Sequence, residues 1–460
     1  MPDLVGDIKK RLTLGEREES IRADLLAKGY LEEDVTLALS RSQASAVRMQ
    51  QRNALRAKTR GLTLKEIFDR LAFGLGSQQF INILLFQTGA SLFLIGILNG
   101  LKVFFHPFIN SYLDESFHYV KRLKTRMVVS GMFNALAFLA FGASIALHDV
   151  ALFAVSVILG GIFGEIHGST YDEFLTRTLG THKTPFLQRH ATLGLFIAGV
   201  ALVIGGLLLD QVVDGYLLLF IIIFFSLVIA LLAFLRTREL PRKDLESGIR
   251  ISLFGFLLDL FKDIGPFFSD KAIIILLLTG SITSFIQVLG YSYYGIFIWE
   301  ALGNTGFGPF MNVALIFVFA LLGTFAGNFI TQSNAKEYGK FPLLVFGTIL
   351  MAIMPLTYFY NPNLLSVAMA TILGVVGSSI VGIARSILAV EIVPLKERAS
   401  FFRLSGLLSS LPLLLFIPLG AWYADAFYFR KLFLLLGMIL ILIVVPLYMY
   451  ILLAHDRNKI

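Results

Sequence analysis

The stretch NGLKVFFHPFINSYLDESFHYVKRLKTR, residues 99–126, decides how the rest of the chain is interpreted. It begins inside an apolar run, residues 91–108, that is long enough to enter a lipid bilayer. Its polar side chains recur at gaps of three, four and four residues: Asn99, Lys102, His106 and Asn110. On a helix this spacing places all four on one face. An ionisable residue inside a membrane span is costly and usually faces a polar pathway, so the stretch predicts a membrane helix that lines one.

The composition supports a protein that lies mostly in lipid. Of 460 residues, 56% are hydrophobic and only 15% are charged, and the mean hydropathy is +0.77. The absence of cysteine excludes disulfides, thiolate metal sites and a cysteine nucleophile. The first residues lack the apolar core of a cleavable signal, so we expect the first membrane span to direct insertion.

Twelve apolar segments are long enough, or nearly so, to cross the hydrocarbon core as helices. They are residues 68–88, 91–113, 127–147, 150–174, 186–209, 214–235, 272–297, 306–330, 341–359, 363–388, 402–424 and 431–453. Strands are excluded because continuous apolar runs of this length do not alternate with a period of two. The sequence therefore predicts an all-α membrane protein with twelve transmembrane helices.

The cations indicate the orientation of these spans. With both termini cytoplasmic, 35 of the 39 Lys and Arg residues fall on the cytoplasmic side, which is the positive-inside bias. Only Arg430 and Lys431 fall outside, while Lys102 and Arg385 lie within spans. The formal charge of +8 is thus a topology signal and not a nucleic-acid surface. We expect a multi-pass protein of the cell membrane with the lipid bilayer as its surroundings.

The predicted organisation has four parts. A cytoplasmic helical hairpin or tether is expected over residues 1–62, followed by a first six-helix bundle over residues 63–236. A cytoplasmic linker follows over residues 237–271, and a second six-helix bundle over residues 272–460. The linker contains an amphipathic segment, residues 251–264, that suits the inner membrane interface. In the N-terminal part, IRADLLAKGYLEEDVTLALSRS is similar to small modules of the ubiquitin-associated type, so a partner-binding module is the alternative to a tether.

The two bundles resemble each other in sequence. LGLFIAGVALVIGGLLLD, which ends at Asp210, has the same layout as LSSLPLLLFIPLGAWYAD, which ends at Asp425. Both segments follow basic loops, with Arg189 and Arg403 in nearly equivalent places. Duplicated six-helix halves around a site at the bilayer midplane are the architecture of a secondary transporter.

Over residues 66–455 the sequence resembles the major facilitator superfamily. The stretch FINSYLDESFHYVKRLKTRM after the second span looks like the loop signature of that family. GNFITQSNAKEYGKFPLLVFG, with Lys336, Gly339 and Lys340, is similar to its second-half copy. ALVIGG in the fifth span resembles the antiporter signature, although Ala201 and Leu202 replace its Gly-Pro. The resemblance implies that spans 1, 4, 7 and 10 line a central cavity.

The polar residues of these spans are candidates for a substrate or proton pathway. Span 1 offers Gln78 and Asn82 on one face, span 4 offers Glu165, Ser169 and Asp172, and span 7 offers Ser284, Gln287, Tyr291 and Tyr294. The pathway set that we predict consists of Lys102, Glu165, Gln78, Asn82, Asn99, His106, Gln287, Tyr291, Tyr294 and Arg385.

Lys102 and Glu165 fall at similar depths in spans 2 and 4, so mutual pairing is expected to reduce their cost in the membrane. The functional hypothesis is that Glu165 takes up protons and that Lys102 is its alternating partner or a substrate contact. The alternative is a permanent structural ion pair. His167 is expected to be either a packed histidine or a proton shuttle, and Arg385 either a snorkelling cation or a ligand.

A cytoplasmic gate is the second predicted site. It comprises Asp114, Lys121, Arg122, Arg126 and Asp172, with Asp114 capping a neighbouring helix and Asp172 pairing with a loop cation. The same cations also serve as a topology signal. Glycines in spans 4 and 5 are interpreted as helix packing rather than a nucleotide site, because no Gly-Lys-Ser/Thr phosphate loop is present.

The sequence favours a secondary active transporter of a small solute that works by alternating access, and the antiporter-like segment favours proton-coupled efflux of the drug-efflux kind. The alternatives are uptake of a sugar, an organic anion or another metabolite, and a non-transporting sensor or scaffold. We expect no enzyme activity, no cofactor and no metal, a small-molecule substrate and protons as partners, and a monomer.

Overall fold

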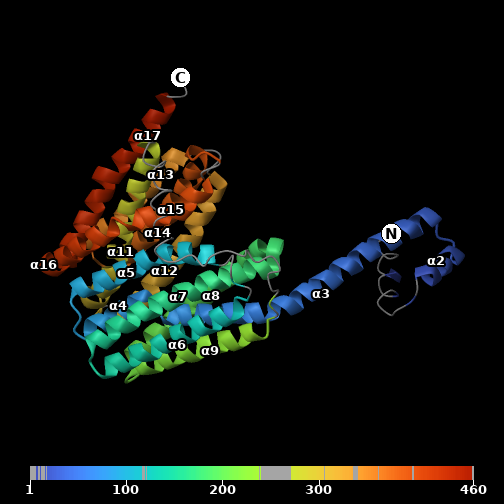
Figure 1. The fold of residues 1–460 in the computed structure, drawn as a ribbon, viewed down its shortest axis with the longest axis horizontal. Coiled ribbons are helices and arrows are strands. Elements are labelled where there is room, and N and C mark those ends of the chain that lie inside the picture. Colours follow the sequence, from blue (N-terminus) through green and yellow to red (C-terminus); the bar gives the residue numbers. More distant parts are fainter. Residues whose placement is uncertain are drawn as a thin grey trace. The chain divides into compact units, whose positions relative to one another are not determined.

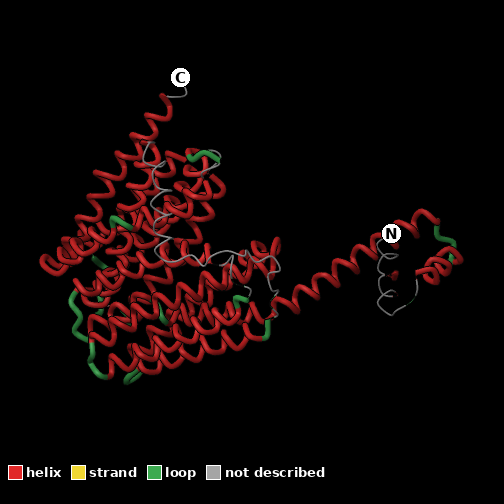
Figure 2. The backbone as a smooth tube through the Cα atoms, in the orientation of Figure 1, coloured by secondary structure: helices red, strands yellow, loops and turns green. Residues whose placement is uncertain are grey.

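The computed structural model describes residues 7–8, 11, 16, 18–116, 120, 122–237, 239, 271–304, 306–334, 340–360, 362–395 and 398–457. This part of the chain is helical and contains no strand (Figures 1 and 2). Its first helices are α2 (Glu18–Ala27), α3 (Glu32–Leu75), α4 (Gln78–Gln87), α5 (Leu92–Ser116), α6 (Lys124–Ala146), α7 (Val150–Leu179), the 3-10 turn η2 (Gly180–His182), α8 (Lys183–Gln211) and α9 (Gly215–Leu235). The later ones are α11 (Lys271–Ala301), α12 (Pro309–Asn334), α13 (Lys340–Tyr360), α14 (Leu364–Ile392), α15 (Arg398–Ser410), α16 (Leu413–Ile439), the π-helical turn η4 (Leu440–Val444) and α17 (Val445–Arg457).

The chain divides into two compact units, residues 1–64 with 233–238, and residues 65–232 with 239–460. The first unit has a small apolar core of its own, made of Ile8, Ile21, Leu25, Val35, Ala38 and Leu39. Helix α2 ends before Gly29, whose φ of +85° is the left-handed conformation that glycine adopts without strain. Asp24 accepts hydrogen bonds from Lys28 and Arg11, and these two cations lower the pKa of Asp24.

The second unit contains the apolar helices. Nine candidate membrane spans occur in the described part of the chain, judged by length and hydropathy. Two of them, Val150–Gln211 and Ser405–Ile451, are 62 and 47 residues long and each includes more than one helix. The chain is therefore a multi-pass, all-helical membrane protein, as the sequence predicted. The count of twelve spans stays a prediction.

The first predicted span, residues 68–88, is two helices rather than one. Helix α3 ends at Leu75 and helix α4 begins at Gln78, with Gly76 and Ser77 between them. Glycine and serine favour termini over helix interiors, and two glutamines follow directly. The break places the side chain of Gln78 at the first turn of a new helix.

A second interruption lies inside α16. Tyr428 has a φ of 66° and a ψ of 155°, which no helix can contain, so α16 is two helical segments that meet at this residue. The break falls between the predicted spans 402–424 and 431–453. The hydroxyl of Tyr428 donates to the carboxylate of Glu300 on α11, at 2.6 Å to each oxygen.

Helices from the first predicted half pack closely on helices from the second. Helix α8 lies against α12, α5 against α16, and α4 against α11. At the first of these seams, a side chain at Gly206 would come within 2.9 Å of Ala314 and 3.1 Å of the carbonyl of Phe310. At the second, a side chain at Gly96 would come within 2.6 Å of Ala421. Small residues let the backbones approach closely, as expected for packing in lipid.

Candidate functional site

A polar cavity of about 510 Å³ lies between the helices of the two predicted halves. Its polar lining comes from α4, α5, α7, α11 and α14: Gln78, Asn99, Lys102, His106, Glu165, Ser284, Gln287, Tyr291, Ser292 and Ser378. Three members of the polar stripe of residues 99–110 are thus in the lining. The fourth, Asn110, lies one turn further along α5 and contacts His106.

The break between α3 and α4 explains how Gln78 reaches the cavity. From the first turn of α4, its Nε2 donates to Asn82 Oδ1 and Asn99 Oδ1, both at 2.9 Å. Asn82 is buried and donates to the carbonyl of Ser292 on α11, at 3.1 Å. Asn82 is therefore a support of the site and does not line it. This amide network joins α4, α5 and α11.

Among the described residues that line the polar cavity, Lys102 and His106 are the basic ones, and Lys102 carries the ammonium group. Its side chain is open to the cavity, and its Nζ donates to Gln78 Oε1 at 2.9 Å. Among the described side chains, no carboxylate oxygen lies within 4 Å of this ammonium group. The expected pair between Lys102 and Glu165 is thus not formed in this structure.

Glu165 pairs instead with His106. The distance between Glu165 Oε2 and His106 Nδ1 is 2.5 Å, and the two side chains are 23% and 57% exposed. Asn110 Nδ2 donates to His106 Nε2 at 3.3 Å, and the hydroxyl of Ser169 donates to Asn110 Oδ1. If Nε2 accepts, the proton of the ring is on Nδ1 and faces the carboxylate. Sequence spacing could not distinguish the two partners, because Lys102 and His106 are one turn apart on the same face of α5.

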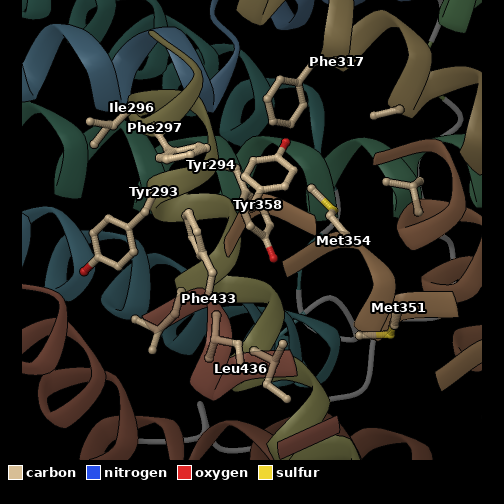
Figure 3. Close-up of a cluster of buried hydrophobic side chains, with 14 of the residues drawn as sticks. Tyr293, Tyr294, Ile296, Phe297, Phe317, Met351, Met354, Tyr358, Phe433 and Leu436 are labelled. Atoms are coloured by element: carbon tan, nitrogen blue, oxygen red, sulfur yellow. The ribbon is translucent and has the colours of Figure 1, made fainter. Parts of the chain in front are cut away.

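Span 7 contributes three of its four predicted polar residues to the polar cavity: Ser284, Gln287 and Tyr291. Gln287 Nε2 donates to the hydroxyl of Ser378 on α14 at 2.5 Å, and Tyr291 is also part of the lining. Tyr294, which we predicted to face the pathway, is buried in an aromatic cluster instead (Figure 3). Its ring centroid lies 4.6 Å from that of Tyr358 and 5.0 Å from that of Phe433.

Arg385 lines a different, smaller cavity of about 250 Å³ together with His106 and Ser284. Its guanidinium donates to Thr283 Oγ1 across 3.5 Å, a weak contact. His167 Nδ1 lies 3.1 Å from the carbonyl of Met127, and the residue also lines another cavity of about 480 Å³, so the choice between a packed histidine and a proton shuttle stays open. Lys65 is buried, pairs with Asp69 and lies 3.6 Å from the ring centroid of Tyr171.

The predicted cytoplasmic gate is only partly described. Lys121, Lys336, Gly339, Lys396 and the segment 251–264 lie outside the described residues, as does the side chain of Asp114. Arg122 is exposed, and Arg126 donates to Ser116 Oγ at 3.1 Å. Asp172 pairs with Lys183 at 2.7 Å rather than with the described loop cations, because the short turn η2 brings the start of α8 next to the end of α7.

One contact between the two predicted halves had no signal that we read from the sequence. Asp210, at the end of α8, accepts hydrogen bonds from the backbone N–H groups of Phe310 and Met311, at 3.1 and 2.8 Å. These N–H groups belong to the first turn of α12, so the carboxylate caps a helix of the other predicted half. Gly308 has a φ of +124°, and a side chain there would come within 2.5 Å of the carboxylate.

Comparisons with known proteins find no matching family model and no matching curated protein. Solved structures do match. A mutant of the nucleoside transporter NupG aligns with a TM-score of 0.70 at 11% identity, over 85% of this chain and 98% of its own. A bacterial homologue of the iron transporter ferroportin, in an inward-facing state, aligns with a TM-score of 0.65 at 14% identity, over 86% and 98%. A POT family transporter in complex with a peptide conjugate aligns with a TM-score of 0.62 at 13% identity, over 86% and 96%.

At these identities the likeness concerns the fold. All three matches are transporters, and each aligns over nearly its whole length. Together with the apolar helices, they show that the chain shares the fold of these transporters, which agrees with the resemblance that its sequence bears to the major facilitator superfamily.

Proposed function

We propose that the chain is a secondary active transporter that carries a small organic anion together with protons. The observation that carries the proposal is the ammonium group of Lys102, which forms no salt bridge with the described residues of the polar cavity between the predicted halves, while the one carboxylate of that described lining, Glu165, contacts His106. A charge in such a place is costly unless a counter-charge joins it. The bound substrate supplies that counter-charge, and the amides of Gln78, Asn99 and Gln287 supply hydrogen bonds.

The proposed cycle is alternating access by twelve spans in two six-helix halves around the cavity. Both termini are cytoplasmic in this scheme, which the distribution of Lys and Arg supports. The seams α8–α12 and α5–α16 then lie on the outer side of the membrane. The neighbouring folds of a nucleoside, a metal and a peptide transporter support transport of small solutes in general.

The charges of the cavity support cotransport. With one proton shared between Glu165 and His106, the pair is neutral and Lys102 leaves a net charge of +1. A bound monoanion then makes the cavity neutral. Without that proton the empty cavity is neutral as well. Closing a cavity away from water is least costly when its contents are neutral. The transporter therefore changes between its inward-open and outward-open states in two forms: loaded with the anion and protonated, or empty and deprotonated.

This coupling corresponds to uptake, one of the alternatives that the sequence left open. The rival is proton-coupled efflux, which the antiporter-like segment ALVIGG supports. The two make opposite predictions in proteoliposomes: an alkaline interior accumulates the anion if anion and proton move together, whereas an acidic interior accumulates it if they exchange.

Replacing Lys102 tests the proposed anion site. We expect Lys102→Gln to weaken binding of the organic anion by about thirtyfold or more, because loss of one partner of a buried charge pair costs roughly 2 kcal/mol or more. Lys102→Arg should keep part of the affinity. The measurement is a thermal-shift screen of purified protein against carboxylates and monophosphates, followed by calorimetry with the best ligand.

Arg385→Gln is the matched control, since it removes a membrane-embedded cation from the neighbouring cavity. It should change the dissociation constant by less than about twofold. Equal affinity of wild type and Lys102→Gln for every anion that binds would refute the anion site. If only Arg385→Gln weakened anion binding, the anion site would have to be assigned to the smaller cavity.

Deleting residues 1–60 distinguishes a transporter from a sensor. The N-terminal unit has its own apolar core, so it is a candidate for partner binding. A transporter is expected to keep its anion flux per molecule within about twofold after the deletion, measured in proteoliposomes at matched protein density. Loss of flux would instead favour a protein whose output depends on the N-terminal unit.

A further inference from the structure

A second cavity of about 480 Å³ adjoins the polar one and has a different chemistry. It extends among α6, α7, α8, α9 and α12, where most of its lining is apolar or aromatic: Phe138, Phe141, Val157, Leu202, Leu227 and Phe317. Polar side chains also line it, among them Asp69, Asn134, His167 and Thr324. Its volume is in the range of small-molecule sites. An apolar space of this size suits a hydrocarbon group better than a hydrated one.

The two cavities are continuous in their lining. Gln78, Lys102, Glu165 and Tyr291 belong to both. Lys102 lies at the junction because its alkyl stem runs past Gly161 of α7, where an added side chain would come within 3.5 Å of the lysine Cγ. The stem therefore faces the apolar cavity while the ammonium group reaches Gln78 on α4.

We propose that the transported anion is an amphiphile: an organic phosphate or carboxylate whose charged head pairs with Lys102 and whose single alkyl chain fills the cavity between α6, α7 and α8. This inference rests on the proposed function, since it uses the same lysine. It adds the apolar cavity, which a small hydrophilic anion would leave empty. When Glu165 and His106 share a proton, a fully apolar solute would leave the charge of Lys102 unbalanced, and a cationic amphiphile would add a second positive charge beside it.

Gly164 offers a way to fill the apolar cavity without changing the charge of the site. It lines that cavity, and an added Cβ would only reach ordinary contact with Asn134, at 3.4 Å. In Gly164→Leu the rest of the side chain extends into the cavity. Gly168, one turn further along α7, lines neither cavity and has nothing within 4 Å of an added Cβ. Gly168→Leu is therefore the matched control on the same helix.

The experiment measures binding to the full chain in lipid nanodiscs, with empty nanodiscs subtracted. The probes are octyl phosphate and ethyl phosphate, the pair octanoate and propionate, and octyltrimethylammonium as a probe of opposite charge. For wild type and Gly168→Leu, the octyl anion of at least one pair should bind at least tenfold tighter than its short partner, which equals about 1.4 kcal/mol. Octyltrimethylammonium should not bind above the background of empty nanodiscs.

In Gly164→Leu this preference for the longer chain should fall to less than about threefold, while the short anion still binds and thereby reports a folded site. Equal binding of long and short anions to wild type would overturn the amphiphile and leave the anion transporter intact. A preference that survives in Gly164→Leu would overturn the assignment of the chain to this cavity. Failure of every anion to bind would overturn both the amphiphile and the proposed function.

Discussion

Glu165→Gln is expected to abolish accumulation of the anion driven by a pH gradient, while exchange of labelled for unlabelled anion persists. Glutamine keeps the size of the side chain and can still accept a hydrogen bond from His106, but it cannot take up and release the proton. The empty cavity then retains the charge of Lys102 in every state. Closing over one unpaired charge costs several kcal/mol, so we expect net uptake to fall by about a hundredfold or more.

The measurement compares two assays in the same proteoliposomes: accumulation with an alkaline interior, and exchange at equal pH on both sides. Glu173→Gln is the matched control. It removes a carboxylate two turns further along α7, where Glu173 pairs with Arg177 at 2.7 Å outside both central cavities. That variant should keep both activities. If Glu165→Gln still accumulated the anion with unchanged dependence on pH, the proton would have to be carried by another group.

Asp210→Ala is expected to shift the population strongly toward the state that is open to the outside. The carboxylate accepts two hydrogen bonds from the first N–H groups of α12, and each charged hydrogen bond contributes roughly 1.5–3 kcal/mol. The start of a helix also carries a partial positive charge that the carboxylate offsets. Loss of about 3 kcal/mol changes the ratio of the two states by about a hundredfold.

The absence of cysteine makes this shift measurable, because introduced cysteines carry the only spin labels. Val213 and Phe307 flank the cap on either side, and they are 91% and 67% exposed, so Val213→Cys and Phe307→Cys leave the packing intact. Pulsed electron paramagnetic resonance should find one short distance in the parent and a longer, dominant distance after Asp210→Ala.

Asp149→Ala is the control for loss of a helix cap as such. Asp149 accepts from the N–H of Leu152 in its own helix α7, at 3.0 Å, and so joins nothing across the two halves. Its loss should lower thermal stability and leave the distance distribution unchanged. An identical distribution in Asp210→Ala and the parent would show that the cap does not hold the outer side closed.

The polar stripe of α5 could be read from the sequence because spacing fixes direction on a helix. Asn99, Lys102 and His106 face one cavity for that reason. The partner of Glu165 could not be read, because two cations on that face differ only by one turn of depth. The burial of Tyr294 could not be predicted from the sequence either. Which side of α11 faces the cavity depends on how Tyr294 packs against Tyr358 and Phe433.

The fold class followed from hydropathy and the loop signatures, but the interruptions did not. The break at Gly76 and Ser77 falls inside a segment that is apolar enough to be taken as one span. The cap of α12 by Asp210 joins residues 100 positions apart, and nothing local to either segment indicates it. Such contacts depend on how the two halves meet in space, which hydrophobic patterning does not specify.

The interruption between α3 and α4 lets the two parts of the first predicted span contact different helices. The short helix α4 is bonded to α11, since Gln79 and Asn82 donate to backbone carbonyls of that helix. Helix α3 contacts α7 instead, where Lys65 lies over the ring of Tyr171. In the proposed alternating-access cycle, we expect the two non-helical residues, Gly76 and Ser77, to act as a hinge, so that α3 can move with one predicted bundle while α4 stays bonded to α11 of the other.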